Sequence, residues 1–117
     1  MNKRNKKIND YLNKVVERLK AADPYKIILF GSHAKGTAKP DSDIDLMVIL
    51  DNEILTRGEE NSTRDCKIIK LIYDIYYKKG MDIQIYSRAE YNYLKNRDSF
   101  FIYEIEKTGE TIYEKYH

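Results

Sequence analysis

The stretch from Asp43 to Leu50 constrains the fold more than any other part of this sequence. From Leu46 onward every residue is apolar, and because side chains of a strand alternate between its two faces, both faces must then be covered. Strands covered on both faces lie in the interior of sheets that carry packed helices. We therefore expect residues 43–50 to form a central strand of a sheet flanked by helices.

Other segments supply the partners that such a strand needs. Short apolar runs predict three further strands, at 26–30, 81–86 and 111–113. Helical spacing of apolar residues predicts helices at 5–20, 63–78 and 97–107, and a Ser-x-x-Glu pattern at 87–90 is typical of another helix start. The chain of 117 residues is long enough for one core but hardly for two. The prediction is a single α+β domain spanning residues 1–117, a small mixed sheet flanked by helices.

The predicted helix at 63–78 contains the single cysteine of the chain. Its apolar stripe would comprise Cys66, Ile69, Ile72, Tyr73 and Tyr76. A lone cysteine within an apolar helical pattern is usually a buried structural thiol. It cannot form an intrachain disulfide, and no cluster of Cys and His indicates a zinc site.

Charge and hydropathy exclude several classes of function. With 21 basic and 19 acidic side chains the net charge is +2, so the strongly basic surface of a nucleic-acid-binding protein is not expected. The basic N-terminus lacks the apolar core of a signal peptide, and no apolar run approaches the length of a membrane span. We expect a soluble, cytoplasmic protein without membrane contact.

Two aspartates at the start of the central strand are the first candidate site residues. Asp43 and Asp45 are two positions apart, so they project from the same face at a separation of about 7 Å along the strand. Two like charges so placed repel, and a divalent cation between them would remove that cost. Mg²⁺ is typically held by one or two carboxylates together with phosphate oxygens of a substrate.

Asp82 is a candidate third carboxylate because it opens the next predicted strand. If that strand lies beside 43–50 in the same direction, Asp43, Asp45 and Asp82 meet at one end of the sheet. Three carboxylates can hold two metal ions about 4 Å apart. One ion would activate an attacking hydroxyl and the other would stabilise a leaving pyrophosphate.

Gly31 and Ser32 follow the strand at 26–30 and begin a predicted helical turn. A glycine at this point allows the main chain to approach a phosphate closely, and N–H groups at a helix start favour anions. The Ser32 hydroxyl can add a hydrogen bond, and Lys35 can add a positive charge. Each piece alone has an ordinary structural explanation: a turn, a solvated strand start, a surface lysine. Their order on predicted strand ends is what favours a site.

The segment from Gly31 to Leu46 resembles the signature of the polymerase β-like nucleotidyltransferases. That signature is Gly-Ser, a spacer, and Asp-x-Asp. The spacer here, from His33 to Ser42, has the length typical of the minimal nucleotidyltransferases (MNT). Ala34, Gly36 and Ser42 match as well, whereas Lys35 stands where arginine is frequent. Asp82 agrees in type and context with the third acid of the family.

The resemblance implies the polymerase β-like nucleotidyltransferase fold and an Mg²⁺-dependent activity. It implies Asp43, Asp45 and Asp82 as catalytic, metal-binding residues and Gly31, Ser32 and Lys35 as nucleotide-binding residues, with two Mg²⁺ ions and ATP or another NTP as substrate. It also implies a partner, because stand-alone MNT proteins are frequently antitoxins of HEPN toxins, and some add AMP to a tyrosine of the toxin.

Three functions follow from these expectations. The first is transfer of a nucleotide, with AMP from ATP placed first, onto a tyrosine of a cognate HEPN toxin. The second is a non-catalytic antitoxin that masks its toxin by binding, which the intact set of acids disfavours. The third is a small-molecule nucleotidyltransferase that acts as an oligomer, since a chain of this length has no room for a second, acceptor-binding domain.

Overall fold

The computed structural model describes residues 4–55 and 58–116. These residues form a four-stranded sheet with strand order β3-β2-β1-β4. The strands are β1 (Pro24–Phe30), β2 (Ile44–Leu50), β3 (Met81–Ser87) and β4 (Glu110–Glu114). β1 is antiparallel to both of its neighbours, whereas β2 and β3 are parallel. The predicted α+β class with a small mixed sheet is therefore confirmed, and β2 has the predicted interior position.

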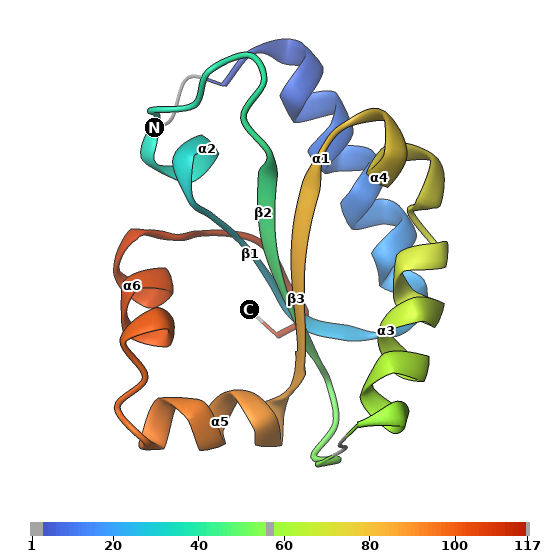
Figure 1. Ribbon diagram of the computed structural model, residues 1–117, viewed down its shortest axis with the longest axis vertical. Helices are drawn as coiled ribbons and strands as arrows, with labels where there is room; N and C mark the ends of the chain where they lie inside the picture. The colour runs from blue at the N-terminus through green and yellow to red at the C-terminus, as the bar shows by residue number, and fades with distance from the viewer. Residues whose placement is uncertain (1–3, 56–57, 117) are drawn as a thin grey trace.

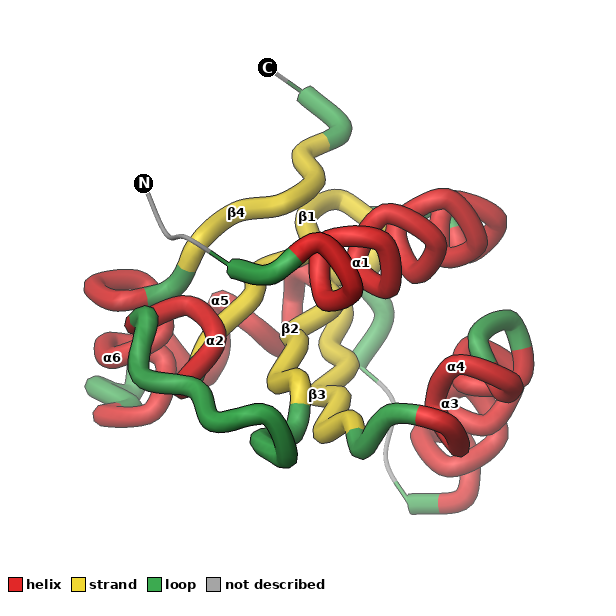
Figure 2. The backbone as a smooth tube through the Cα atoms, turned by 90° about the horizontal axis from the view of Figure 1, so that it is seen from above, coloured by secondary structure: helices red, strands yellow, loops and turns green. Residues whose placement is uncertain are grey.

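Helices lie on both sides of this sheet (Figures 1 and 2). They are α1 (Lys6–Leu19), the 3₁₀ turn η1 (Lys20–Ala22), α2 (Ser32–Lys35), α3 (Glu59–Lys70), α4 (Tyr73–Lys78), α5 (Arg88–Asn96) and α6 (Phe100–Thr108). Figure 1 shows α1, α3 and α4 on one side of the strands and α5 and α6 on the other, with α2 beyond the end of β1. Within the described part of the chain, no helix has the length and apolar content needed to cross a membrane.

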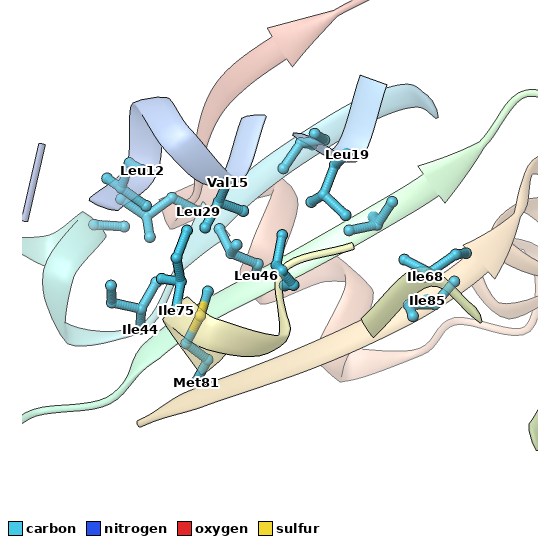
Figure 3. Packing of buried hydrophobic residues seen from close by; sticks show 14 of the residues in the cluster. Leu12, Val15, Leu19, Leu29, Ile44, Leu46, Ile68, Ile75, Met81 and Ile85 are labelled. Carbon is cyan, nitrogen blue, oxygen red and sulfur yellow. The ribbon is translucent and has the colours of Figure 1, made fainter. Parts of the chain in front are cut away.

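Side chains of β2 alternate between two separate cores. Leu46 and Val48 pack with buried residues of α1, α3 and α4, as Figure 3 shows for Leu46. Met47 and Ile49 pack instead with buried residues of α6 and partly buried residues of α5. By the same alternation, Asp45 lies on the face that α5 and α6 cover. The fully apolar run that predicted a central strand thus serves both layers of helices.

Helix α1 forms where the spacing of apolar residues predicted it. The Asn5 side chain accepts a hydrogen bond from the N–H of Ile8 (2.9 Å) and caps the helix start. The side chains that α1 buries are Ile8, Leu12, Val15 and Leu19. The chain then leaves the helix through Asp23, which has a left-handed backbone (φ +53°) directly before Pro24. This turn delivers the chain into β1.

The prediction of one helix at 63–78 was wrong in phase and in extent. Helix α3 begins at Glu59, inside the expected loop, and a break at Leu71–Ile72 separates it from α4. The buried residues of this region are Ile68, Ile72 and Ile75, a stripe at helical spacing that shares only Ile72 with the predicted one. Cys66 is exposed, which corrects the expectation of a buried thiol.

The C-terminal half follows the predicted order more closely. Ser87 ends β3 and caps α5, and both hydrogen bonds of the predicted capping box with Glu90 are present. Ser99 caps α6, which ends just before Gly109. β4 then returns along β1, with Leu29 opposite Glu110.

Candidate active site

The predicted site residues come together at one edge of the sheet. β1 ends where β2 and β3 begin, because β1 is antiparallel to β2 and β2 is parallel to β3. Asp45 is directly opposite Phe30 on one side and Asp82 on the other. Residues paired in this way project from the same face of a sheet. Asp45 and Asp82 are therefore neighbours on the face toward α5 and α6, as the prediction required.

Asp43 lies just before β2 and is exposed. Its carboxylate rests against Gly80, since a Cβ atom added at Gly80 would lie 2.1 Å from Asp43 Oδ1. The N–H of Ile44 donates a hydrogen bond to the carbonyl of Gly80 (2.9 Å). The entry to β2 is thus fastened to the segment that leads into Asp82. The contact of Gly80 with Asp43 is one that sequence reasoning missed.

Gly31 provides the corresponding space for Asp45. A Cβ atom at Gly31 would lie 2.1 Å from Asp45 Oδ2, and its backbone (φ +73°, ψ −155°) is one that side-chain-bearing residues rarely adopt. Gly31 therefore lets the Asp45 carboxylate rest on the main chain that leads into Ser32. The Asp45 carboxylate therefore lies directly beside the segment predicted to bind phosphate.

The acidic side chains influence one another. Burial raises the pKa of Asp45 above its ordinary value, and the negative charges of Asp82 and Asp43 raise it further, while His33 lowers it. Asp45 is only partly buried, so water screens part of these interactions. The repulsion is nevertheless of the kind that a bound cation relieves.

The donors present fit a magnesium ion whose coordination a substrate completes. In residues 4–55 and 58–116, no three His, Cys, Asp or Glu side chains are close enough to hold one metal ion between them. Mg²⁺ does not require such a set, because it commonly uses one or two carboxylates together with water and substrate phosphates. Asp43 and Asp45 match that requirement, with Asp82 beside Asp45 in the register.

Gln84 holds the carboxylate of Asp82. The Gln84 amide donates a hydrogen bond to Asp82 Oδ1 (3.1 Å), and the hydroxyl of Tyr86 lies 3.5 Å from Gln84 Oε1. These three residues occupy alternate positions of β3 and so share one face. Sequence reasoning missed Gln84, although its position two residues after Asp82 in a predicted strand was a signal that could have found it.

The loop before Asp43 is held by the buried residue His33. Its Nε2 lies 3.1 Å from the carbonyl oxygen of Ser42, and since a carbonyl only accepts, His33 donates from Nε2. The Ser42 hydroxyl in turn accepts from the N–H of Lys39 (2.8 Å). His33 is thus a structural, hydrogen-bonded residue.

The other predicted nucleotide-binding residues lie on α2. Ser32 is its first residue and is half-buried, and Lys35 is its last and is exposed. Ser32 directly follows Gly31, against which the Asp45 carboxylate rests. Their contact with a nucleotide stays a prediction.

The chain is similar to several known proteins. The chain is 33% identical over 82 residues to a Methanocaldococcus jannaschii protein named "Putative protein adenylyltransferase MJ1305", an alignment that covers 67% of this chain and 52% of that protein. The chain thus spans about half the length of this curated relative.

Two solved structures share the fold. The crystal structure of a "putative nucleotidyltransferase" from Sulfolobus solfataricus superposes with a TM-score of 0.59 at 15% identity, covering 98% of this chain and 93% of the other. A crystal structure of a toxin–antitoxin with AMP-PNP superposes with a TM-score of 0.50 at 18% identity, covering 89% and 73%. The model of the family described as "Polymerase beta, Nucleotidyltransferase" matches residues 6–117. The chain therefore belongs to the polymerase β nucleotidyltransferase family.

Proposed function

We propose that this protein is an Mg²⁺-dependent nucleotidyltransferase that moves AMP from ATP to a tyrosine of a cognate HEPN toxin. The observation that carries the proposal is the position of Asp43, Asp45 and Asp82 at one sheet edge, with the Asp45 carboxylate against Gly31, in a chain that matches the family over 6–117. The AMP group, the protein acceptor and the toxin partner are finer parts of the proposal and have separate support.

In the proposed reaction, the acceptor hydroxyl and the leaving pyrophosphate lie on opposite sides of Asp45. The acceptor hydroxyl oxygen forms a bond to the α-phosphorus of ATP, and the bond from that phosphorus to the bridging oxygen of the β-phosphate breaks. Pyrophosphate leaves with that electron pair, and the hydroxyl proton passes to a base. Asp82 is exposed beside Asp45 and would accept that proton on the acceptor side.

The triphosphate would lie on the opposite side of Asp45, along Gly31 and Ser32. There the close approach of main chain allowed by Gly31 and the hydroxyl of Ser32 provide polar contacts, and Lys35 supplies charge. Asp43 and Asp45 would hold Mg²⁺, which when bound neutralises phosphate charge and the charge of the departing pyrophosphate. His33 and Gln84 would position the carboxylates through the contacts described above.

A protein acceptor suits the openness of the acidic edge. Asp43 and Asp82 are both exposed, so a side chain on a large partner can reach them. The name of the Methanocaldococcus jannaschii relative refers to protein adenylylation, and the fold is shared with a chain solved as a toxin–antitoxin with AMP-PNP. The first supports AMP as the group and a protein as the acceptor, and the second supports an adenine nucleotide and a toxin partner.

The test is to incubate the protein with a co-purified toxin, Mg²⁺ and ATP and to measure the intact mass of the toxin. We expect one or more adenylate additions that map to tyrosine. Asp45→Asn should abolish them, whereas the matched control Asp41→Asn, at an exposed acid of the same loop, should not. If Asp45→Asn neutralises the toxin as well as the wild type, with no adenylate on it in either case, the protein is a binding antitoxin and the proposal is wrong.

A further inference from the structure

An aromatic pair lies beside the acidic residues on the same face of the sheet. Phe30, the last residue of β1, is directly opposite Asp45, and its side chain belongs to the cluster packed under α5 and α6. The ring of Phe101 on α6 meets it edge to face, with centroids 5.6 Å apart and planes at 89°. Figure 1 shows α6 beside this face of the sheet, next to α2.

Phe101 is exposed, in contrast to the residues of α6 that form the core. Ile102 and Ile105 are the buried residues of α6, whereas 41% of Phe101 is accessible to solvent. Phe30 is half-buried. The pair therefore presents an accessible aromatic surface adjacent to the carboxylates, and accessible apolar groups beside a polar site are typical of ligand-binding surfaces.

The geometry of nucleotidyl transfer indicates which ligand this surface takes. The attacking oxygen and the leaving pyrophosphate lie roughly in line through the phosphorus. With pyrophosphate beside Gly31 and the acceptor beside Asp82, this line crosses the sheet from β1 toward β3. The nucleoside is a further substituent on the same phosphorus and must leave that line. Phe30 is directly opposite Asp45, and Phe101 packs on it from α6, which covers this face. A nucleoside that leaves the line away from the sheet, toward α6, therefore meets this pair.

We propose that Phe30 and Phe101 form the platform on which the base of the nucleotide stacks. This inference rests on the proposed function and adds to it the subsite for the nucleoside. Aromatic rings stack on any nucleobase because every base has a π face, so the platform gives affinity for the base without selecting among the four. The acceptor tyrosine is the competing occupant, and the attack line places it on the β3 side.

The first test compares two ligands that differ in the nucleoside. ATP and tripolyphosphate share the phosphate chain, and only ATP carries a base. Phe101→Ala should weaken ATP binding about tenfold, in keeping with the loss of one base–aromatic stack, and should leave tripolyphosphate binding unchanged. Phe100→Ala is the matched control, because Phe100 is the adjacent aromatic of α6, is 74% exposed and stacks on Tyr103 instead. It should change neither affinity.

The second test uses fluorescence and retains an aromatic ring. The sequence contains no tryptophan, so Phe101→Trp introduces a single indole at the platform. ATP should quench or shift its emission and bind at least as tightly as to the wild type, while tripolyphosphate should leave the emission unchanged. Phe100→Trp should show no response to ATP.

The outcomes separate this inference from the proposed function. If the wild type binds ATP and Phe101→Ala weakens ATP and tripolyphosphate equally or not at all, the platform is wrong while the proposed function stands. If Phe101→Ala instead raises only the KM of the toxin substrate, the platform takes the acceptor and the inference is overturned. If the wild type binds neither ATP nor tripolyphosphate, the proposed function fails, and this inference with it.

Discussion

At the residue scale, Gly31 determines where the Asp45 carboxylate lies. Gly31→Ala would place a methyl group 2.1 Å from Asp45 Oδ2 and strain the backbone at φ +73°. We expect it to abolish transfer and to cost about 1–2 kcal/mol of stability. Gly58→Ala is the matched control, because Gly58 also has a positive φ (+59°) but nothing within 4 Å of an added Cβ. It should lower the melting temperature comparably and leave turnover per folded molecule intact, and loss of turnover there would contradict the steric explanation.

We predict that the Asp45 carboxylate is required for transfer and lowers the stability of the protein in the absence of Mg²⁺. Because burial and the charges of Asp82 and Asp43 raise its pKa, its ionised form disfavours the folded state at neutral pH. Asp45→Asn should therefore abolish transfer and, without Mg²⁺, melt at or slightly above the wild-type temperature at pH 7. The difference in melting temperature should shrink as the pH falls and the wild-type carboxyl takes up a proton. A clearly lower melting temperature for the variant at pH 7 would contradict this account.

The placement of the acidic residues at one sheet edge could be predicted from sequence, whereas the contact of Asp43 with Gly80 could not. Spacing along strands was enough for Asp43, Asp45 and Asp82, because alternation and strand order are local or topological properties. The contact of Gly80 with Asp43 depends on two strands meeting at one particular register, which no local pattern contains. Gln84 was within reach of the same alternation that identified the aspartates.

At the scale of elements, Ser87 sets the point where the chain passes from β3 into α5. Its fully buried side chain accepts from the N–H of Glu90, and the Glu90 carboxylate accepts from the N–H of Ser87. Ser87→Ala should cost about 1 kcal/mol, a fall in melting temperature of about 4 °C for a chain of this size. Ser99→Ala, which removes a longer single cap bond to Ile102 (3.3 Å), should cost less. Equal losses of melting temperature in the two variants would contradict an added contribution from the capping box.

Strands and capped helices were predictable here, and the α3–α4 region was not. The capping box at 87–90 is a local hydrogen-bond pattern, so its residues specify it directly. In contrast, the apolar residues of 63–78 fit more than one helical stripe. The predicted stripe contained Cys66, whereas the stripe buried in the core contains Ile68, Ile72 and Ile75. A weakly amphipathic segment leaves its phase to its tertiary neighbours.

At the scale of the whole molecule, Asp51 joins the far end of the sheet to the C-terminal segment. It accepts hydrogen bonds from Lys115 (2.7 Å) and Tyr116 (2.8 Å), and Arg88 lies 3.4 Å away. Lys115 first and Tyr116 second hold the pKa of Asp51 below its ordinary value. This contribution to stability is present above the pKa of the unfolded chain, near 4, and is lost as pH falls through the lower folded value.

We therefore expect Asp51→Asn to melt at a lower temperature than the wild type at pH 7, with the two melting curves converging in strong acid. The measurement is a melting-temperature series from pH 7 to pH 2. Glu53→Gln is a suitable control, because Glu53 pairs with the same Arg88 (3.0 Å) from a well-exposed position. Its curve should run close to that of the wild type throughout, and a convergence like that of Asp51→Asn would contradict the assignment.

The hydrogen bond from Ile44 to Gly80 also has a consequence for folding during synthesis. Residues 31–45 are synthesised before Asp82. The hydrogen bond between Ile44 and Gly80 closes the long loop between them, and the entropic cost of that closure is not offset by local contacts. A nascent chain that has folded only its first helix and hairpin holds two of the acids and lacks the third. In urea, ATP turnover should accordingly vanish at the same midpoint as the near-ultraviolet circular dichroism. If Asp82 is required for transfer, as proposed, each active molecule would then be one that has finished folding.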